Sequence, residues 1–266
     1  EAGPGFVYGA AGYELQAVWQ EKMTNAVSAA ELIPGWVPVF SLETVAELEP
    51  LLRERIVRRH IRAGVRVLDP NAVYIDPRVT IGRGTMILPG TILRGDTHIG
   101  CGCPIGRGTM LLPGTILRGE TAVGCGCTIG PNAVVRDCVI GDETEINASQ
   151  VNESTIGSRT HVGPFAYVRP GCAIGDDIKV GDFVELKNST IGEGTKISHL
   201  TYVGDSDVGG HVNFGCGTVT VNYDGTSKFR TVIGDHAFIG CNTNLVAPVR
   251  VGEGAYTAAG STITDE

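Results

Sequence analysis

The sequence has few aromatic residues and no long apolar run. Aromatic residues make up 6% of the 266 positions, whereas glycine occurs 38 times. An ordinary layered core depends heavily on Phe, Tyr and Trp, so this composition favours a chain that turns often and packs small aliphatic layers. No stretch of about 18 apolar residues is present, and a membrane-spanning helix requires one. We therefore expect no membrane association.

An excess of positive charge is also missing. The formal net charge is −8 at pH 7, which argues against nonspecific nucleic-acid binding, because that binding depends on neutralising phosphates with Lys and Arg. Residues 1–10 have neither the basic start nor the apolar core of a secretory signal. Without such a signal, the eight cysteines are interpreted as reduced thiols. The sequence thus predicts a cytoplasmic protein with no nucleic-acid partner.

What the sequence has in abundance is a six-residue repeat. Aliphatic residues recur at Ile75, Ile81, Ile87, Leu93, Ile99, Ile105, Leu111, Leu117, Val123 and Ile129. A small residue follows each of them by four positions, as Thr85 follows Ile81, and the register slips near Cys138 before it resumes. A period of six is a multiple of the strand period and fits a helix of about 3.6 residues per turn poorly. Because stacked turns of such a chain share one core, the repeat predicts an all-β parallel β-helix with three hexads per coil.

The remaining chain divides into three parts. Residues 1–41 are an unassigned segment, within which a short helix is expected over residues 13–29. Residues 42–64 are expected to form a linker helix that Pro50 divides or kinks and Gly64 ends. Residues 65–266 are the β-helix, which is interrupted around residues 221–230.

The β-helix contains an internal duplication. Residues 81–104 and 105–128 agree at 19 of 24 positions. Twenty-four residues are four hexads, one more than a coil needs. The extra hexad therefore either rotates the upstream coils by a third of a turn or loops out of the ladder, and the sequence leaves both outcomes open.

Two Cys-x-Cys pairs within the duplication could suggest zinc. The pairs, Cys101 with Cys103 and Cys125 with Cys127, are 24 residues apart, so we expect them on different faces of the prism. Cys103 and Cys127 also fall in the inward-facing small position. The histidines show no three-ligand spacing. We interpret the cysteines as packing residues and expect no metal site.

Two cations are expected to stack on neighbouring coils. Arg169 follows Val168 and Lys187 follows Leu186, 18 residues later, which predicts a separation of roughly 5 Å along the ladder. Stacked like charges repel unless an anion lies between or beside them, and both side chains are phosphate ligands. A phosphate-bearing substrate is one hypothesis, and two solvated outward charges are the alternative.

Two further features are expected at the surface. His199 lies two positions after Ile197, so it points outward, where an imidazole can accept a proton at neutral pH. The interruption of the hexads places Asn222, Tyr223 and Lys228 on an ejected loop, and such loops on rigid scaffolds often carry function. These three side chains would suit a partly anionic ligand, whereas an ordinary solvated turn is the alternative.

Longer strings in the downstream half are more specific than the hexads. They are Gly163-Pro-Phe-Ala-Tyr-Val-Arg-Pro-Gly171, Gly181-Asp-Phe-Val-Glu-Leu-Lys-Asn188, Gly194-Thr-Lys-Ile-Ser-His-Leu-Thr-Tyr-Val-Gly204, Val212-Asn-Phe-Gly-Cys-Gly-Thr218, Asn222-Tyr-Asp-Gly225 and Leu245-Val-Ala-Pro-Val249. In order and spacing they resemble the C-terminal domain of the bifunctional N-acetylglucosamine-1-phosphate uridylyltransferase/glucosamine-1-phosphate acetyltransferase family. The likeness covers about residues 42–266, and it implies that the β-helix is left-handed.

The resemblance also implies a role for individual residues. The general base that takes a proton from the sugar amine would be His199, oriented by Glu185. The acceptor site would be formed by Arg169, Lys187, Tyr202, Asn213 and Lys228. The acetyl-CoA site would be formed by Cys216, Asn222, Tyr223, Cys241 and Ala259.

The implied reaction is acetyl transfer from acetyl-CoA to the amine of glucosamine-1-phosphate, carried out by a homotrimer without a metal. The product, N-acetylglucosamine-1-phosphate, would serve UDP-N-acetylglucosamine and peptidoglycan synthesis. Two alternatives stay open: a noncatalytic truncated or engineered β-helix scaffold, and a related acyltransferase with another amino-sugar acceptor.

The sequence departs from the family at both ends. No Leu-x-x-Gly-x-Gly-Thr-Arg-Met segment is present, so we expect no uridylyltransferase activity. The chain also stops before the family's C-terminal arm, so weaker binding of coenzyme A is expected.

Overall fold

The computed structural model describes residues 5–9, 12–18, 37–39, 42–100 and 108–264, which belong to two compact units, Glu1–Arg59 and His60–Glu266. The first unit contains an antiparallel sheet of β1 (Gly5–Gly9), β2 (Gly12–Val18) and β3 (Val37–Val39), in the order β2-β1-β3. The helix predicted over residues 13–29 is therefore wrong for residues 13–18. Apolar and polar residues alternate from Tyr13 to Ala17 with the strand period, and β2 pairs with β1. Residues 19–29 lie outside the described residues.

Helix α2 (Leu42–Arg62) precedes the β-helix in the sequence. The helix runs through Pro50 without a break. The expectation that Pro50 divides the helix is therefore wrong. Gly64 follows the helix with φ +94°, a left-handed conformation that glycine adopts without the steric cost other residues incur. Its N–H donates to the carbonyl of Ile61 at 3.0 Å, which caps the end of the helix.

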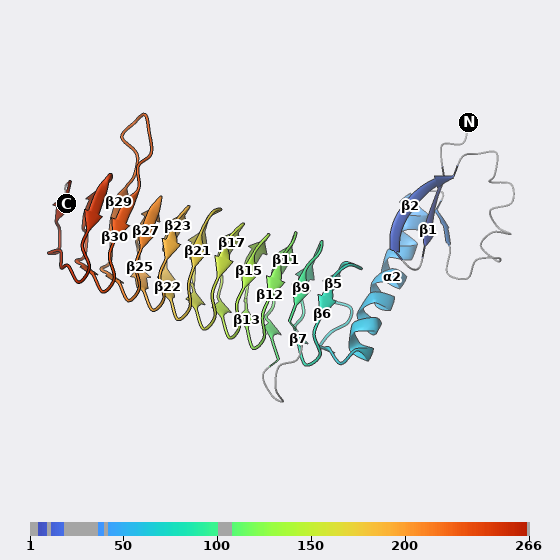
Figure 1. The fold of residues 1–266 in the computed structure, drawn as a ribbon. Coiled ribbons are helices and arrows are strands. Elements are labelled where there is room, and N and C mark those ends of the chain that lie inside the picture. Colours follow the sequence, from blue (N-terminus) through green and yellow to red (C-terminus); the bar gives the residue numbers. More distant parts are fainter. Residues whose placement is uncertain (1–4, 10–11, 19–36, 40–41, 101–107, 265–266) are drawn as a thin grey trace. The chain divides into compact units, whose positions relative to one another are not determined.

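Three parallel sheets form a left-handed β-helix, which confirms the predicted fold (Figure 1). Face 1 consists of β4 (Arg66–Val67), β7 (Met86–Ile87), β10 (Met110–Leu111), β13 (Thr128–Ile129), β16 (Glu145–Ile146), β19 (His161–Val162), β22 (Lys179–Asp182), β25 (Lys196–His199), β28 (Asn213–Phe214) and β31 (Phe238–Ile239).

Face 2 consists of β5 (Tyr74–Ile75), β8 (Ile92–Leu93), β11 (Ile116–Arg118), β14 (Val134–Arg136), β17 (Gln150–Asn152), β20 (Tyr167–Val168), β23 (Glu185–Lys187), β26 (Tyr202–Gly204), β29 (Val219–Val221), β32 (Asn244–Val246) and β34 (Thr262–Ile263). Face 3 consists of β6 (Thr80–Ile81), β9 (His98–Ile99), β12 (Ala122–Val123), β15 (Val139–Ile140), β18 (Thr155–Ile156), β21 (Ala173–Ile174), β24 (Thr190–Ile191), β27 (Ser206–Val208), β30 (Thr231–Ile233) and β33 (Val249–Val251).

The core is a stack of aliphatic layers with threonines at the corners. Ile87, Leu93 and Leu117 are fully buried, as the hexad pattern predicts. Thr97, in the small position, is also fully buried, and its hydroxyl donates to the carbonyl of Arg94 at 2.7 Å. The small position therefore also satisfies a corner carbonyl that would otherwise lack a donor.

The duplication does not rotate the prism. Met86 pairs with Met110, and Ile92 pairs with Ile116, so residues 24 apart stack directly and the strands stay on their original faces. The rotation of the upstream coils is therefore excluded, and residues 101–107 of the duplicated segment lie outside the described residues. Our expectation that residues 24 apart fall on different faces is wrong for these described residues, because they pair within one sheet.

The cysteine interpretation is only partly testable. Cys127 is buried in the inward small position, as expected, whereas Cys101, Cys103 and Ile105 lie outside the described residues. Among the described residues, no cluster of three or more His, Cys, Asp or Glu side chains is arranged to hold a metal ion.

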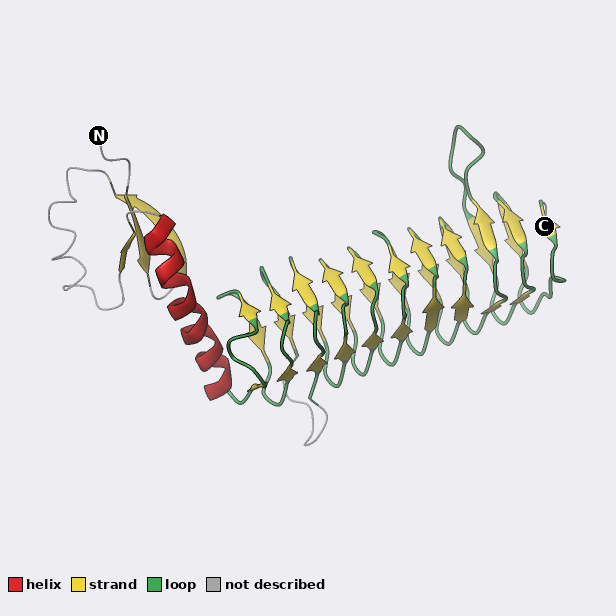
Figure 2. Cartoon of the chain, turned by 180° about the vertical axis from the view of Figure 1, so that it is seen from behind, coloured by secondary structure: helices red, strands yellow, loops and turns green. Residues whose placement is uncertain are grey.

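A loop is ejected between β29 and β30 (Figure 2). Thr190 pairs with Asp207, 17 residues later, but Ser206 pairs with Thr231, 25 residues later. Residues 222–230 account for this excess, and we call them the ejected loop. Inside it, Tyr223 and Lys228 form an antiparallel bridge, so the loop is a small hairpin that stands off the prism.

Candidate active site

The two predicted cations lie on neighbouring coils of face 2. Arg169 follows β20, and its N–H donates to the carbonyl of Leu186 in β23 at 2.8 Å, directly before Lys187. Each cation has a carboxylate partner: Arg169 Nη1 lies 2.9 Å from Glu185 Oε1, and Lys187 Nζ lies 3.0 Å from Asp205 Oδ2. The protein's own carboxylates therefore offset part of the repulsion.

A third cation reaches the same place from the ejected loop. The side chain of Lys228 contacts that of Lys187, and this contact lowers the pKa of Lys228 from its usual value. Burial by itself would lower the pKa of Lys187. The hydrogen bonds of Lys187, above all the one with Asp205, together have the larger effect, so its pKa is raised. Three cations thus face two carboxylates, which leaves a net positive charge on the surface.

Asp205 is a buried hub between β26 and β27. It is 6% exposed. Its Oδ2 accepts from Lys187 Nζ and, at 2.5 Å, from Asn222 Nδ2, while its Oδ1 accepts from Asn188 Nδ2 at 2.6 Å. Burial raises the pKa of Asp205, but these donors outweigh burial and hold it below its usual range. Sequence reasoning missed this residue.

Tyr202 and Asn222 complete the face 2 cluster. Asn222 Nδ2 also donates to Tyr202 Oη at 3.3 Å, which joins the predicted acceptor side chain to the first residue of the ejected loop. Tyr223 is 55% exposed, and its hydroxyl donates to the carbonyl of Gly225 at 2.6 Å. The structure therefore brings Arg169, Lys187, Tyr202, Asn222 and Lys228 together.

His199 is held by an aspartate. It ends β25 and is exposed, as predicted, and its Nδ1 lies 2.6 Å from Asp182 Oδ1. Because an ionised carboxylate only accepts hydrogen bonds, Nδ1 carries the proton, and in the neutral imidazole Nε2 then holds the lone pair. The hydrogen bond from His199 lowers the pKa of Asp182, so this carboxylate stays ionised well into the acid range.

Glu185 does not orient His199, contrary to our expectation. Glu185 pairs with Arg169 on face 2, whereas Asp182 lies directly opposite His199 in the β22–β25 ladder. The sequence held a signal for this pairing. Asp182 follows the buried Val180 by two positions, as His199 follows Ile197, so the two share a hexad position on neighbouring coils.

A column of residues runs along the corner between faces 1 and 2. It begins with His199 and continues with small residues on the following coils. Ile197 pairs with Phe214 and Phe214 with Ile239, so Cys216 and Cys241 occupy the position of His199 on the next two coils. Gly260 N–H donates to the carbonyl of Cys241 at 2.7 Å, which places Ala259 on the coil after that. We call His199, Cys216, Cys241 and Ala259 the corner column.

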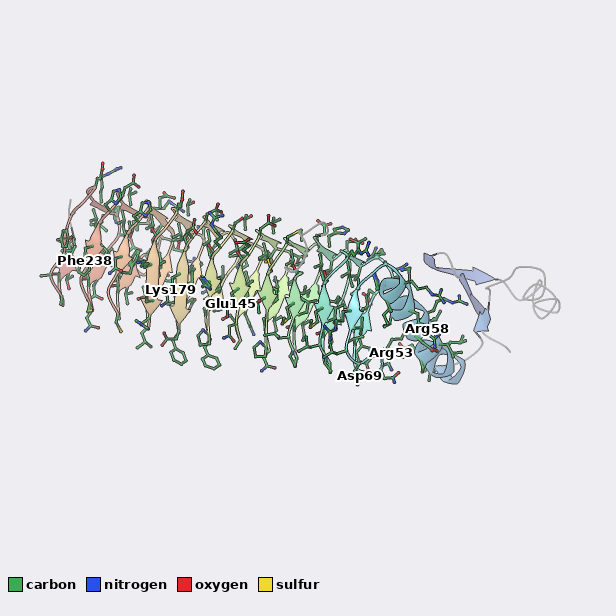
Figure 3. The ribbon with its side chains drawn as sticks, turned by 90° about the horizontal axis from the view of Figure 1, so that it is seen from below. Arg53, Arg58, Asp69, Glu145, Lys179 and Phe238 are labelled. Carbon is green, nitrogen blue, oxygen red and sulfur yellow. The ribbon has the colours of Figure 1, made fainter. Side chains whose placement is uncertain are left out.

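Asn213 lies on another face of the prism. Figure 3 marks the outward side of face 1 by Glu145, Lys179 and Phe238. Asn213 belongs to the same outward column, because it pairs with Lys196 on one side and with Phe238 on the other. The predicted acceptor residues are therefore divided between face 1, which carries Asn213, and face 2.

Comparisons with known proteins identify the family of this chain. A family model, bacterial transferase hexapeptide (six repeats), matches residues 153–188 and 230–265. The bifunctional protein GlmU of Clostridium kluyveri is 49% identical over 222 residues, which cover 84% of this chain and 43% of that protein. GlmU of Geobacillus sp. (strain WCH70) gives the same identity and coverage. The chain therefore spans less than half the length of these curated relatives.

More distant likeness extends to solved structures. UDP-N-acetylglucosamine O-acyltransferase (LpxA) from Moraxella catarrhalis shares 17% identity, with a TM-score of 0.35 over 67% of this chain and 66% of that one. Within the described residues, no helix is long and apolar enough to cross a membrane.

The repeats and the GlmU relatives decide the assignment: this chain belongs to the bacterial hexapeptide-repeat transferases, as a relative of the C-terminal acetyltransferase domain of the bifunctional GlmU proteins.

Proposed function

We propose that this chain transfers the acetyl group of acetyl-CoA to the amine of glucosamine-1-phosphate, yielding N-acetylglucosamine-1-phosphate for UDP-N-acetylglucosamine and peptidoglycan synthesis. The observation that carries the proposal is the His199–Asp182 pair, at 2.6 Å. This pair presents a free Nε2 at the head of the corner column. The three cations around Lys187 lie on the face that meets this corner.

The cation cluster supports a phosphorylated acceptor. Arg169 offers a planar fork and Lys187 and Lys228 offer point charges, which together suit a phosphate. Lys228 and Lys187 are in contact, and a dianion between them would remove their repulsion. An amino sugar without a phosphate would gain nothing from this cluster, so the cluster favours glucosamine-1-phosphate over another amino-sugar acceptor.

The proton transfer follows from the tautomer of His199. The neutral amine attacks the carbonyl carbon of the thioester, and Nε2 of His199 accepts the proton that the nitrogen loses as the C–N bond forms. The C–S bond then breaks, and the leaving sulfur takes up a proton to give coenzyme A. Asp182 stabilises the imidazolium that forms in between. Holding both substrates on one rigid surface supplies much of the rate, and no step requires a metal.

Acetyl-CoA is assigned to the corner column and the ejected loop. Cys216, Cys241 and Ala259 have small side chains on successive coils, so a linear pantetheine chain would lie along them. Asn222 and Tyr223, at the base of the loop that follows β29 of face 2, would contact another part of the cofactor. The thioester would then lie at the His199 end of the column, beside the base.

A homotrimer would complete the acceptor site. Asn213 lies on face 1, whereas the cations lie on face 2. One substrate would contact both if face 1 of one copy faced face 2 of the next, and three copies close such a head-to-tail contact. Light scattering should give three times the monomer mass, and a monomer with full activity would rule the shared site out.

The function is tested by following thiol release from acetyl-CoA with glucosamine-1-phosphate as acceptor. His199→Ala should lower kcat by about 100-fold or more. His211→Ala is the matched control, because His211 is an exposed histidine stacked on His236, away from the corner column, and it should keep wild-type activity. Absence of turnover by the wild type would favour the noncatalytic scaffold, and equal rates with unphosphorylated glucosamine would favour another acceptor.

A further inference from the structure

The ejected loop carries a charge that should push it away from the site. Lys228 lies near its C-terminal end, and its side chain contacts that of Lys187. Two ammonium groups in contact repel each other. The hydrogen bonds inside the loop, such as Phe229 N–H to the carbonyl of Asn222 at 2.9 Å, shape the hairpin but do not fix where it stands. Something outside the loop must hold it over Lys187.

The N-terminal end of the loop is held by Asp205. Asn222, the first loop residue, is 8% exposed and donates to Asp205 Oδ2 at 2.5 Å. The same oxygen accepts from Lys187 Nζ at 3.0 Å. The backbone of Asp205 is itself anchored, because its N–H donates to the carbonyl of Lys187 at 2.9 Å and its carbonyl accepts from Thr231 N–H at 3.2 Å. One buried carboxylate thus joins the cation site to the loop.

The C-terminal end of the loop is held by Arg230. Its guanidinium makes a two-pronged pair with Asp207, in which Nε lies 2.9 Å from Oδ2 and Nη2 lies 2.5 Å from Oδ1. The group also donates to the carbonyl of Ser206 at 3.1 Å and to the carbonyl of Asn188 at 3.4 Å. Arg230 therefore reaches two neighbouring coils at once, which a lysine could not do with the same geometry.

We propose that Asp205 and Arg230 are positioning residues that clamp the two ends of the ejected loop, so that Lys228 is held over Lys187 and Asn222 is held beside Tyr202. The proposal rests on the proposed function for what the clamp serves, namely the joining of the phosphate site to the acetyl-CoA loop. The clamp preorganises two cations against their own repulsion. Because the loop is already ordered, binding of a phosphate does not include the entropic cost of ordering it.

Limited proteolysis tests the clamp independently of activity. Trypsin cleaves after Lys228, and the cleavage rate reports how readily the loop leaves the surface. Asp205→Asn and Arg230→Gln should each speed this cleavage severalfold at a temperature where far-UV circular dichroism shows that both variants remain folded. Arg159→Gln is the matched control, because Arg159 makes an equivalent two-pronged pair with Asp177 on another coil, and it should leave cleavage after Lys228 unchanged. Wild-type cleavage rates in both clamp variants would overturn the proposal.

Kinetics then distinguish positioning from simple loss of structure. Asp205→Asn should raise KM for both substrates by about tenfold or more. The change removes the charged acceptor of Lys187, in the phosphate site, and of Asn222, in the proposed acetyl-CoA site. Arg230→Lys should recover part of the loss seen in Arg230→Gln. The pH profile of kcat should keep its wild-type midpoint in all three variants, because Asp182 and His199 are untouched. A fall in kcat with unchanged KM values would contradict the clamp and indicate only less active protein. A wild type without acetyl transfer would remove the proposed function, whereas the proteolysis result would still decide the clamp.

Discussion

The partner of His199 shows how hexad register acts on single residues. Asp182 and Glu185 are three positions apart, and both are acidic neighbours of the site. A corner of the prism separates them, so Asp182 faces His199 along one ladder while Glu185 belongs to the next face and pairs with Arg169. Asp182, and not Glu185, therefore sets the tautomer of His199.

Gly204 is a residue whose missing side chain makes room for the site. A Cβ at this position would overlap Tyr202 Oη and would lie 2.8 Å from Asn222 Nδ2. Both are side-chain ends that can move, so Gly204→Ala should cost little stability. It should instead raise KM for acetyl-CoA severalfold, because Asn222 loses its position.

Gly215→Ala is the contrasting variant. Its Cβ would overlap the backbone nitrogen of Cys241, so neighbouring coils would have to separate. We expect it to lower the free energy of unfolding by about 1–3 kcal/mol. Denaturant unfolding and steady-state kinetics on the two variants check both statements, and an unchanged KM in Gly204→Ala would show that Asn222 does not contact the cofactor.

At the scale of elements, the corner column predicts which thiols react. Cys241 is exposed and Cys216 is half-buried, whereas Cys138 and Cys172 are buried. Burial raises the pKa of the Cys138 and Cys172 thiols, which lowers their thiolate fraction and their reactivity. Iodoacetamide at neutral pH should therefore label Cys241 faster than Cys216, and it should leave Cys138 and Cys172 unlabelled in the folded protein.

Labelling of the corner column should also abolish binding of acetyl-CoA, since the added group occupies the proposed pantetheine path. Peptide mapping by mass spectrometry identifies the labelled positions, and Cys241→Ala serves as a control that should resist loss of activity at that position. Acetyl-CoA present during labelling should protect both residues. Full activity after complete labelling of Cys241 would place the cofactor elsewhere.

At the scale of the whole molecule, paired carboxylates predict sensitivity to acid. Hydrogen bonds lower the pKa of Asp205 against the effect of its burial, and the pair with Arg230 lowers the pKa of Asp207. A lowered folded-state pKa means that the stabilisation is complete above the unfolded value of about 3.9. It is lost as the pH falls through the lower folded values. The melting temperature should therefore fall as the pH is lowered below about 4.

Asp205→Asn isolates the contribution of one carboxylate. At pH 7 the variant should lose about 1–3 kcal/mol of unfolding free energy, because the three side-chain donors of Lys187, Asn188 and Asn222 then face an amide in place of a charge. The difference from wild type should shrink as the pH falls below about 4, where the wild-type carboxylate also becomes protonated. Melting curves between pH 7 and pH 2.5 measure this, and a difference that stays constant across that range would contradict the assignment.

The sequence by itself determined the repeat architecture and the register of several candidate site residues. The hexad period decides which side chains point inward, because each strand alternates and each corner admits only a small residue. That rule is local, so it predicts that Arg169 and Lys187 lie on neighbouring coils, that His199 points outward and that a loop leaves the prism near residues 221–230. The helix expected over residues 13–29 is wrong for residues 13–18, because the alternating segment from Tyr13 to Ala17 follows the strand period.

Only the tertiary structure decided matters that depend on register between coils. The duplication allowed two pairings of the same residues, one of which rotates the upstream coils. The pairing of Met86 with Met110 excludes that rotation. The partner of His199, the hub at Asp205 and the placement of Asn213 on face 1 have the same origin. Each depends on which residue of the next coil stands opposite, and insertions far away in the sequence can shift that alignment without changing the local pattern.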